Sequence, residues 1–128
     1  MIRVFLAFDD AALGQRLFEY LSGQPDFQVC GKGELGEEAV REAVELRPDI
    51  AILEMAAVDD LQVANALKQH IPNLPLLVVA EEVSLEIEKQ ALAQGVDAVF
   101  PKQDDPMALA LNARALYDLT ANQGEGGS

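Results

Sequence analysis

Charged side chains stand at the ends of short apolar runs in this sequence, where they could do chemistry together. Asp9 and Asp10 follow one apolar run, Glu54 follows a second, and Lys102 comes shortly after a third. Carboxylate oxygens are the ligands that hard divalent cations such as Mg²⁺ prefer, and a lysine beside several carboxylates offsets part of their repulsion. If these residues meet in the fold, they predict either a cation site or a cluster of ion pairs.

The apolar runs have the length of buried strands, and helical patterns separate them. Runs of about four to eight apolar residues are typical of strands covered on both faces. Between the runs, apolar residues recur at helical spacing, as at Leu13, Leu17 and Leu21. Five alternations of strand and helix predict one α/β domain with a parallel, flavodoxin-like sheet of order 2-1-3-4-5 and helices on both faces. The predicted strands are 2–8, 27–31, 50–53, 76–79 and 96–100.

The predicted sheet brings the charged residues to one edge. In a parallel sheet the loops after the strands emerge together, and ligands bind at that edge. Asp9, Asp10, Glu54, Ala80 and Lys102 all follow predicted strands, so we expect all five there. Strands 1 and 3 are neighbours in the predicted order, which brings the acid pair close to Glu54. The three carboxylates would repel one another unless a cation, a proton or Lys102 offset their charge.

The composition predicts one domain and excludes several classes of partner. Half of the 128 residues are hydrophobic, which supports a single core over 1–121, with 122–128 as a flexible Gly-rich tail or linker stub. No apolar run approaches the ~20 residues of a membrane span, and we find no export signal, so we expect a cytoplasmic protein without a membrane partner. With 9 basic and 22 acidic residues, the net charge of −13 argues against direct contact with nucleic acid.

Four segments of the chain, in order and at matching spacing, resemble the receiver domain of two-component response regulators. The resemblance extends over 1–121, and the segment 25–31 is similar to receivers that precede a helix-turn-helix DNA-binding domain. The four segments are 2–10, 47–53, 74–79 and 95–102.

The resemblance implies roles for the residues at the strand ends. In the family, an acid pair holds Mg²⁺, an Asp ending strand 3 accepts a phosphoryl group, and a Lys after strand 5 pairs with that group. A Thr or Ser ending strand 4 hydrogen-bonds the phosphoryl, and an aromatic residue in strand 5 changes rotamer. Asp9 and Asp10 match the acid pair, and Lys102 matches the lysine. The other positions differ: Glu54 stands for the acceptor Asp, Ala80 for the hydroxyl residue and Val99, next to Phe100, for the aromatic.

These differences agree with one another physically. Glu54 is one methylene longer than Asp, so its carboxylate would be displaced from the position for in-line attack, and errors near 1 Å can cost ~100-fold in rate. Ala80 offers no donor to a phosphoryl oxygen, and Val99 cannot swing as an aromatic ring does. We therefore expect an atypical, non-enzymatic receiver that acts without phosphorylation, with Glu54 reaching toward Lys102 as a fixed negative charge.

Alternatives stay open from the sequence. The chain could instead be a phosphorylatable receiver with altered chemistry that controls an attached or partner DNA-binding output. Residual Mg²⁺ could bind at Asp9, Asp10 and Glu54, although the hypothesis requires no cofactor. A flavin or nucleotide carrier of similar topology would need a Gly-rich or Ser/Thr-rich loop after the first strand, and the loop here is acidic.

The resemblance also implies where a partner would dock. In the family, the face of helix 4, strand 5 and helix 5 commonly mediates dimers or partner binding. Here that face corresponds to 86–94, Val99 and 105–117. We expect a protein partner or a homodimer on this surface, and the identity of the partner, the output and the oligomeric state stay open.

Overall fold

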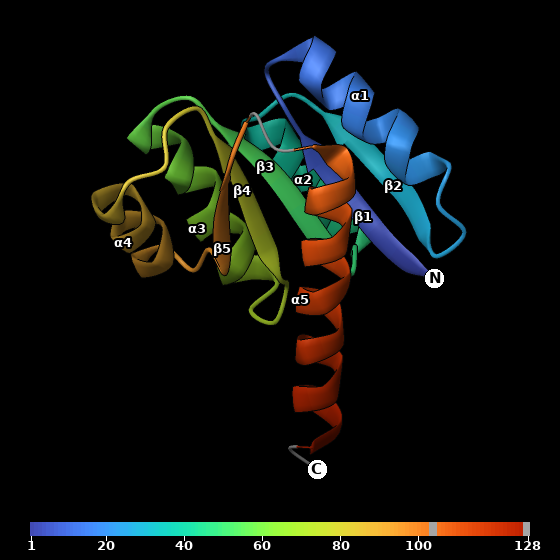
Figure 1. The fold of residues 1–128 in the computed structure, drawn as a ribbon. Coiled ribbons are helices and arrows are strands. Elements are labelled where there is room, and N and C mark those ends of the chain that lie inside the picture. Colours follow the sequence, from blue (N-terminus) through green and yellow to red (C-terminus); the bar gives the residue numbers. More distant parts are fainter. Residues whose placement is uncertain (103–104, 127–128) are drawn as a thin grey trace.

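The computed structural model describes residues 1–102 and 105–126, and it contains one five-stranded parallel sheet in the order β2-β1-β3-β4-β5. The predicted fold class and strand order are therefore confirmed (Figure 1). The strands are β1 (Ile2–Ala7), β2 (Phe27–Gly33), β3 (Ile50–Met55), β4 (Leu76–Ala80) and β5 (Ala98–Pro101). The helices are α1 (Ala11–Ser22), α2 (Glu37–Leu46), α3 (Leu61–His70), α4 (Leu85–Ala93) and α5 (Pro106–Gly126), with a short 3₁₀ turn, η1 (Val58–Asp60), before α3.

Helices cover both faces of the sheet, so the strands divide their side chains between two cores. Successive residues of a strand point to opposite faces. In β3, Ala51, Leu53 and Met55 pack toward α2, α3 and α4, whereas Ile50 and Ile52 pack toward α1 and α5. Glu54 lies two residues after Ile52 in β3, so its side chain points to the same face as those of Ile50 and Ile52, the side of α1 and α5.

Four of the five strands end one or two residues later than the apolar pattern predicts, whereas β1 ends one residue earlier, at Ala7. The pairing of β3 with β4 continues through Glu54 opposite Val79 and Met55 opposite Ala80. Glu54 therefore lies inside β3, not after it as the sequence predicted. The backbone ladder does not depend on side-chain polarity, so it continues past the last apolar residue of the run. Glu54 is held in place by hydrogen bonds of the sheet itself.

The last helix is longer than the apolar pattern predicts. The sequence indicates an end near Thr120, whereas α5 continues to Gly126 and extends past the end of the sheet (Figure 1). Residues 122–126 of the predicted tail thus have helical backbone, and 127–128 lie outside the described residues. Arg114 joins α5 to the segment before β2, because its guanidinium donates to Asp26 and Gln24 and lies over the ring of Phe27.

Candidate functional site

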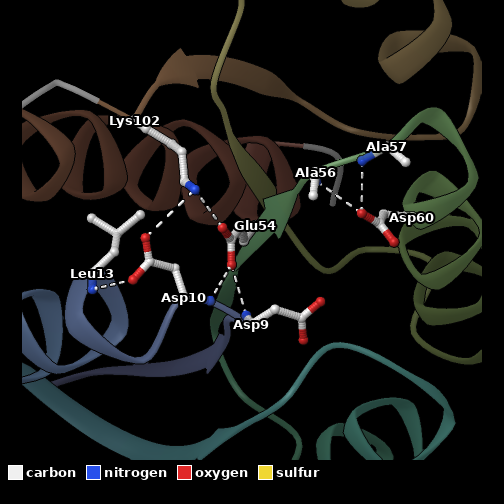
Figure 2. Close-up of polar contacts among 8 residues, drawn as sticks. All are labelled: Asp9, Asp10, Leu13, Glu54, Ala56, Ala57, Asp60 and Lys102. Carbon is white, nitrogen blue, oxygen red and sulfur yellow. Dashed lines mark hydrogen bonds and ion pairs between the residues drawn. The ribbon is translucent and has the colours of Figure 1, made fainter.

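Glu54 is the one charged residue that the described part of the chain buries, at 3% exposure. Its Oε1 accepts hydrogen bonds from the backbone N–H groups of Asp9 and Asp10, both at 2.7 Å. Its Oε2 lies 2.7 Å from Nζ of Lys102 (Figure 2). A buried carboxylate is tolerated only where donors and an opposite charge compensate its lost hydration. Both oxygens of Glu54 have such compensation, so β1, β3 and the end of β5 meet at one carboxylate.

Lys102 is the cation of this cluster. The end of the sheet positions it, because its backbone N–H donates to the carbonyl of Ala80 at 2.8 Å. Its Nζ lies 3.6 Å from Oδ2 of Asp10, in addition to the contact with Glu54. The hydrogen bond to Glu54 raises the pKa of Lys102, and the negative charges of Glu54 and Asp10 act in the same direction. The lysine therefore stays charged and neutralises the acids around it, as the sequence predicted.

Asp10 has two structural partners at the start of α1. Its Oδ1 accepts the backbone N–H of Leu13 at 3.1 Å, the N-cap contact that the sequence indicates. That backbone donor lowers the pKa of Asp10, and the nearby charge of Lys102 lowers it further. Asp10 is consequently ionised at neutral pH and committed to the helix and the lysine.

Asp9 turns away from the other two carboxylates. Its Oδ1 accepts the backbone N–H of Leu35 at 3.2 Å, and its carboxylate points away from Glu54 (Figure 2). Within residues 1–102 and 105–126, no group of three or more His, Cys, Asp and Glu side chains is arranged to hold a metal ion. Both oxygens of Glu54 are bound by backbone donors and by Lys102, and the carboxylate of Asp9 points elsewhere. In this arrangement Asp9, Asp10 and Glu54, the residues that the resemblance assigns to Mg²⁺, do not fit the ion.

A second carboxylate at the same edge is Asp60. Its Oδ2 accepts the backbone N–H groups of Ala56 and Ala57 at 2.8 and 3.0 Å (Figure 2). Sequence reasoning missed this loop contact of Asp60. The available signal was an Asp a few residues after a strand end, because such side chains commonly bond backbone N–H groups in short turns. Two pairs of backbone N–H groups thus each bind a carboxylate of the chain itself: those of Asp9 and Asp10 bind Glu54, and those of Ala56 and Ala57 bind Asp60.

Ala80 and Val99 occupy the remaining switch-equivalent positions. Ala80 is 2% exposed, ends β4, and has no side-chain donor. Val99 packs against the core on the α2, α3 and α4 side, whereas Phe100 packs on the α1 and α5 side. Because neighbouring strand residues face opposite ways, Phe100 cannot take the place of an aromatic residue at 99.

Comparisons with known proteins agree with this fold. No family model matches the chain. It is 34% identical over 106 residues to protein-glutamate methylesterase/protein-glutamine glutaminase 1 of Syntrophus aciditrophicus, covering 80% of this chain and 30% of the relative. It is 27% identical over 119 residues to the response regulator protein VraR of Staphylococcus saprophyticus, covering 91% and 57%. The chain thus spans only part of the length of these relatives.

Solved receiver structures superpose closely on the chain. The signal receiver domain of a modulated diguanylate cyclase from Desulfovibrio desulfuricans gives a TM-score of 0.84 at 24% identity, covering 96% of this chain and 98% of the other. The response regulator domain of Thermotoga maritima CheB gives 0.79 at 23% identity, covering 95% and 97%. These structures, both under 25% identical to the chain, show that it has the receiver fold. The sequence relatives, one of them 34% identical over 80% of this chain, support its place among the response-regulator receiver domains of two-component signalling.

No helix in the described part of the chain has both the length and the apolar character that a membrane crossing requires.

Proposed function

We propose that this receiver domain is atypical and signals through protein–protein contact without being phosphorylated, with Glu54 as a permanent negative charge at the acceptor position. The observation that carries the proposal is the engagement of both Glu54 oxygens, by two backbone N–H groups and by Lys102. In this proposal the domain itself is not an enzyme.

A carboxylate that attacks phosphorus needs a free oxygen aimed along the reaction axis. Glu54 would have to release contacts of 2.7 Å before it could turn an oxygen toward a phosphodonor. Hydrogen bonds to charged groups are worth about 1.5–3 kcal/mol each, so the reactive arrangement lies well above the ground state. Because the side chain of Glu is one methylene longer than that of Asp, the unmodified Glu54 carboxylate already reaches the N–H groups of Asp9 and Asp10 and the amine of Lys102.

The donors that would stabilise a phosphoryl group are also occupied or absent. Lys102 pairs with Glu54, and the N–H pair of Ala56 and Ala57 is taken by Asp60. Ala80 supplies no hydroxyl. Phosphoryl transfer relies on such fixed donors and on metal ions to stabilise the transition state. The proposal accordingly needs no Mg²⁺, and the poor fit of the acid cluster to that ion supports it.

Intact mass measurement after treatment with acetyl phosphate and Mg²⁺ tests this proposal. We expect no gain of mass in the wild-type chain. The double variant Glu54→Asp with Ala80→Thr restores the family's acceptor and hydroxyl and serves as the reactive comparison. The variant Glu54→Gln controls for modification elsewhere. A stable gain of one phosphoryl group that Glu54→Gln abolishes would overturn the proposal and favour the alternative, a phosphorylatable receiver that controls a DNA-binding output.

The proposed contact surface lies on α4, β5 and α5. Seven large hydrophobic residues are exposed in the described part of the chain, and five of them are on α4 or α5. These five, with exposures of 52–68%, are Leu85, Leu92, Met107, Leu111 and Leu119. Exposed large apolar side chains are typical of protein contact sites when they gather on one face, and here they fall mainly on the two helices beside β5. The net charge of −13 supports a protein over a nucleic acid as the partner.

The surface is tested best at its exposed leucines and not at Arg114. Arg114 is engaged with Asp26, so reversing its charge would break a contact within the domain. We expect Leu92→Ser with Leu111→Ser to weaken self-association in sedimentation velocity, or retention of a partner from native lysate. Val58→Ser, at a residue 51% exposed outside this surface, is the control for self-association. Unchanged behaviour of the leucine variant in both measurements would contradict this surface.

A further inference from the structure

A groove runs between the segment after β3 and helix α4, and its lining residues do not include Glu54, Asp9, Asp10 or Lys102. It consists of two neighbouring hollows of about 350 and about 360 Å³ that share Val58. The first is lined by the segment 55–58, by Ala80 to Glu82 and by Ile87. The second continues past Leu61 to the end of α4. Val58 lines both hollows, so the two lie side by side, and together they are called the groove.

The charge of this groove has a single sign. The charged residues along it are Asp59, Glu81 and Glu82, all exposed. None of the three makes an ion pair within the described part of the chain. The chain has 9 lysines and arginines, and none of them lines either hollow. A positively charged occupant would find the unpaired carboxylates of Asp59 and Glu82 there, whereas Glu81 also lines a neighbouring hollow with Lys102, whose pKa the charge of Glu81 helps to raise.

The second hollow offers side-chain amides that suit a peptide. Gln62, Gln90 and Gln94 all line it, and each amide can both donate to and accept from a peptide backbone. The Oε1 atom of Gln90 is buried and has no hydrogen-bond partner among the described residues. An occupant of the hollow would reach this oxygen only after the Gln90 side chain turns toward it, and it would then supply the N–H partner that buried acceptors normally have. Peptide N–H groups and arginine side chains both supply such a donor.

We propose that this groove binds a short, extended, basic peptide segment of another protein. Along α4 the groove reaches from Ile87 to Gln94, about 10 Å at a rise of about 1.5 Å per residue. An extended chain advances about 3.3 Å per residue, so about three residues fit, with arginines at the first and third facing one wall. This site is independent of Glu54, and its test does not depend on whether the domain is phosphorylated.

The test is a ¹⁵N NMR titration of the full chain with the capped pentapeptide Gly-Arg-Leu-Arg-Gly. We expect amide shift changes confined to 57–62 and 80–94. The same pentapeptide with glutamate in place of arginine should produce none. Absence of binding, or changes of equal size spread over the whole acidic surface, would overturn the proposal. Spermidine, a polycation without a peptide backbone, serves as a further control. If it produced the same amide shift changes as the pentapeptide at the same concentration, the groove would not recognise a peptide.

Matched variants separate the groove from the overall negative charge. Glu82→Gln should weaken pentapeptide binding about two- to five-fold, the range for an exposed ion pair. Glu37→Gln removes the same charge from α2, outside the groove, and should leave the affinity unchanged. Gln90→Leu should also weaken binding, because it removes the buried acceptor. Equal effects of Glu82→Gln and Glu37→Gln would show that only net charge matters and would refute the groove. The dispersion of each spectrum reports whether the variant is folded.

Discussion

Replacing Lys102 by Met tests the charge balance at Glu54 most directly. Met keeps most of the length of the lysine stem and removes only the charged amine. The carboxylate of Glu54, at 3% exposure, would then keep two backbone donors and lose the cation that lies 2.7 Å away. Breaking a buried ion pair from one side costs about 3–5 kcal/mol, because the remaining charge stays buried. Lys102 itself is 23% exposed, so we expect the lower end, about 3 kcal/mol.

Urea unfolding at neutral pH measures this loss. With a slope of about 1.5–3 kcal/mol per molar, a loss of about 3 kcal/mol lowers the midpoint by about 1–2 M. The matched control is Lys68→Met, because Lys68 is 22% exposed but pairs at 3.4 Å with Asp97, whose side chain is 36% exposed. Such a solvated pair contributes about 0.2–1 kcal/mol. The two variants thus remove equally covered lysines from a buried and from a solvated carboxylate.

A double variant decides whether the buried charge causes the loss. Glu54→Gln in the Lys102→Met background keeps an acceptor for the two backbone donors and removes the uncompensated charge. We expect the double variant to be more stable than Lys102→Met alone. Equal losses for Lys102→Met and Lys68→Met would refute the reasoning, and so would a double variant no more stable than the single one.

Three further predictions concern acid stability, packing and metal binding. The hydrogen bond from Arg114 lowers the pKa of Asp26 in the folded protein below its ordinary value of 3.8. The ionised Asp26 therefore stabilises the fold above pH 3.8, and this stabilisation is lost as the pH falls through the lower pKa of the folded state. Asp26→Asn should therefore lower the melting temperature at neutral pH but reduce its further fall on acidification to about pH 3, and an unchanged acid dependence would contradict this. Gly31→Ala should lower the free energy of unfolding in urea by about 1–3 kcal/mol, because its methyl group would lie 2.8 Å from the buried ring of Phe5. In Gly33→Ala the methyl group meets nothing closer than 3.7 Å, so the loss should be smaller. Equal losses for the two variants would count against the packing argument. Mg²⁺ should not raise the melting temperature beyond KCl of equal ionic strength, and a saturable rise would show that the strand-end carboxylates rearrange to bind the ion.

The fold could be predicted from the sequence because its main signals are local. Short apolar runs separated by helical stripes predict a parallel sheet, and strand ends in such a sheet meet at one edge. Asp9, Asp10, Glu54 and Lys102 were therefore placed together correctly, and the approach of Lys102 to Glu54 was expected. The ends of β3 and α5 were less well predicted, because backbone hydrogen bonding continues past the apolar pattern at Glu54 and at Thr120.

The chemistry at this edge depends on where each side chain points, and only the tertiary structure decides that. Sequence reasoning placed the carboxylate of Asp9 beside that of Glu54, whereas the Asp9 side chain accepts the N–H of Leu35 from a distant loop and only its backbone N–H contacts Glu54. It did not anticipate that Glu54 accepts the N–H groups of Asp9 and Asp10, or that Asp60 occupies the donors of the loop after β3.

The sequence by itself determined which residues reach the edge of the sheet, because strand and helix periodicity are properties of neighbouring residues. The tertiary structure decided which oxygen faces which donor. Those contacts join residues of β1, β3 and the end of β5, and their geometry is set by the pairing of strands far apart in the chain.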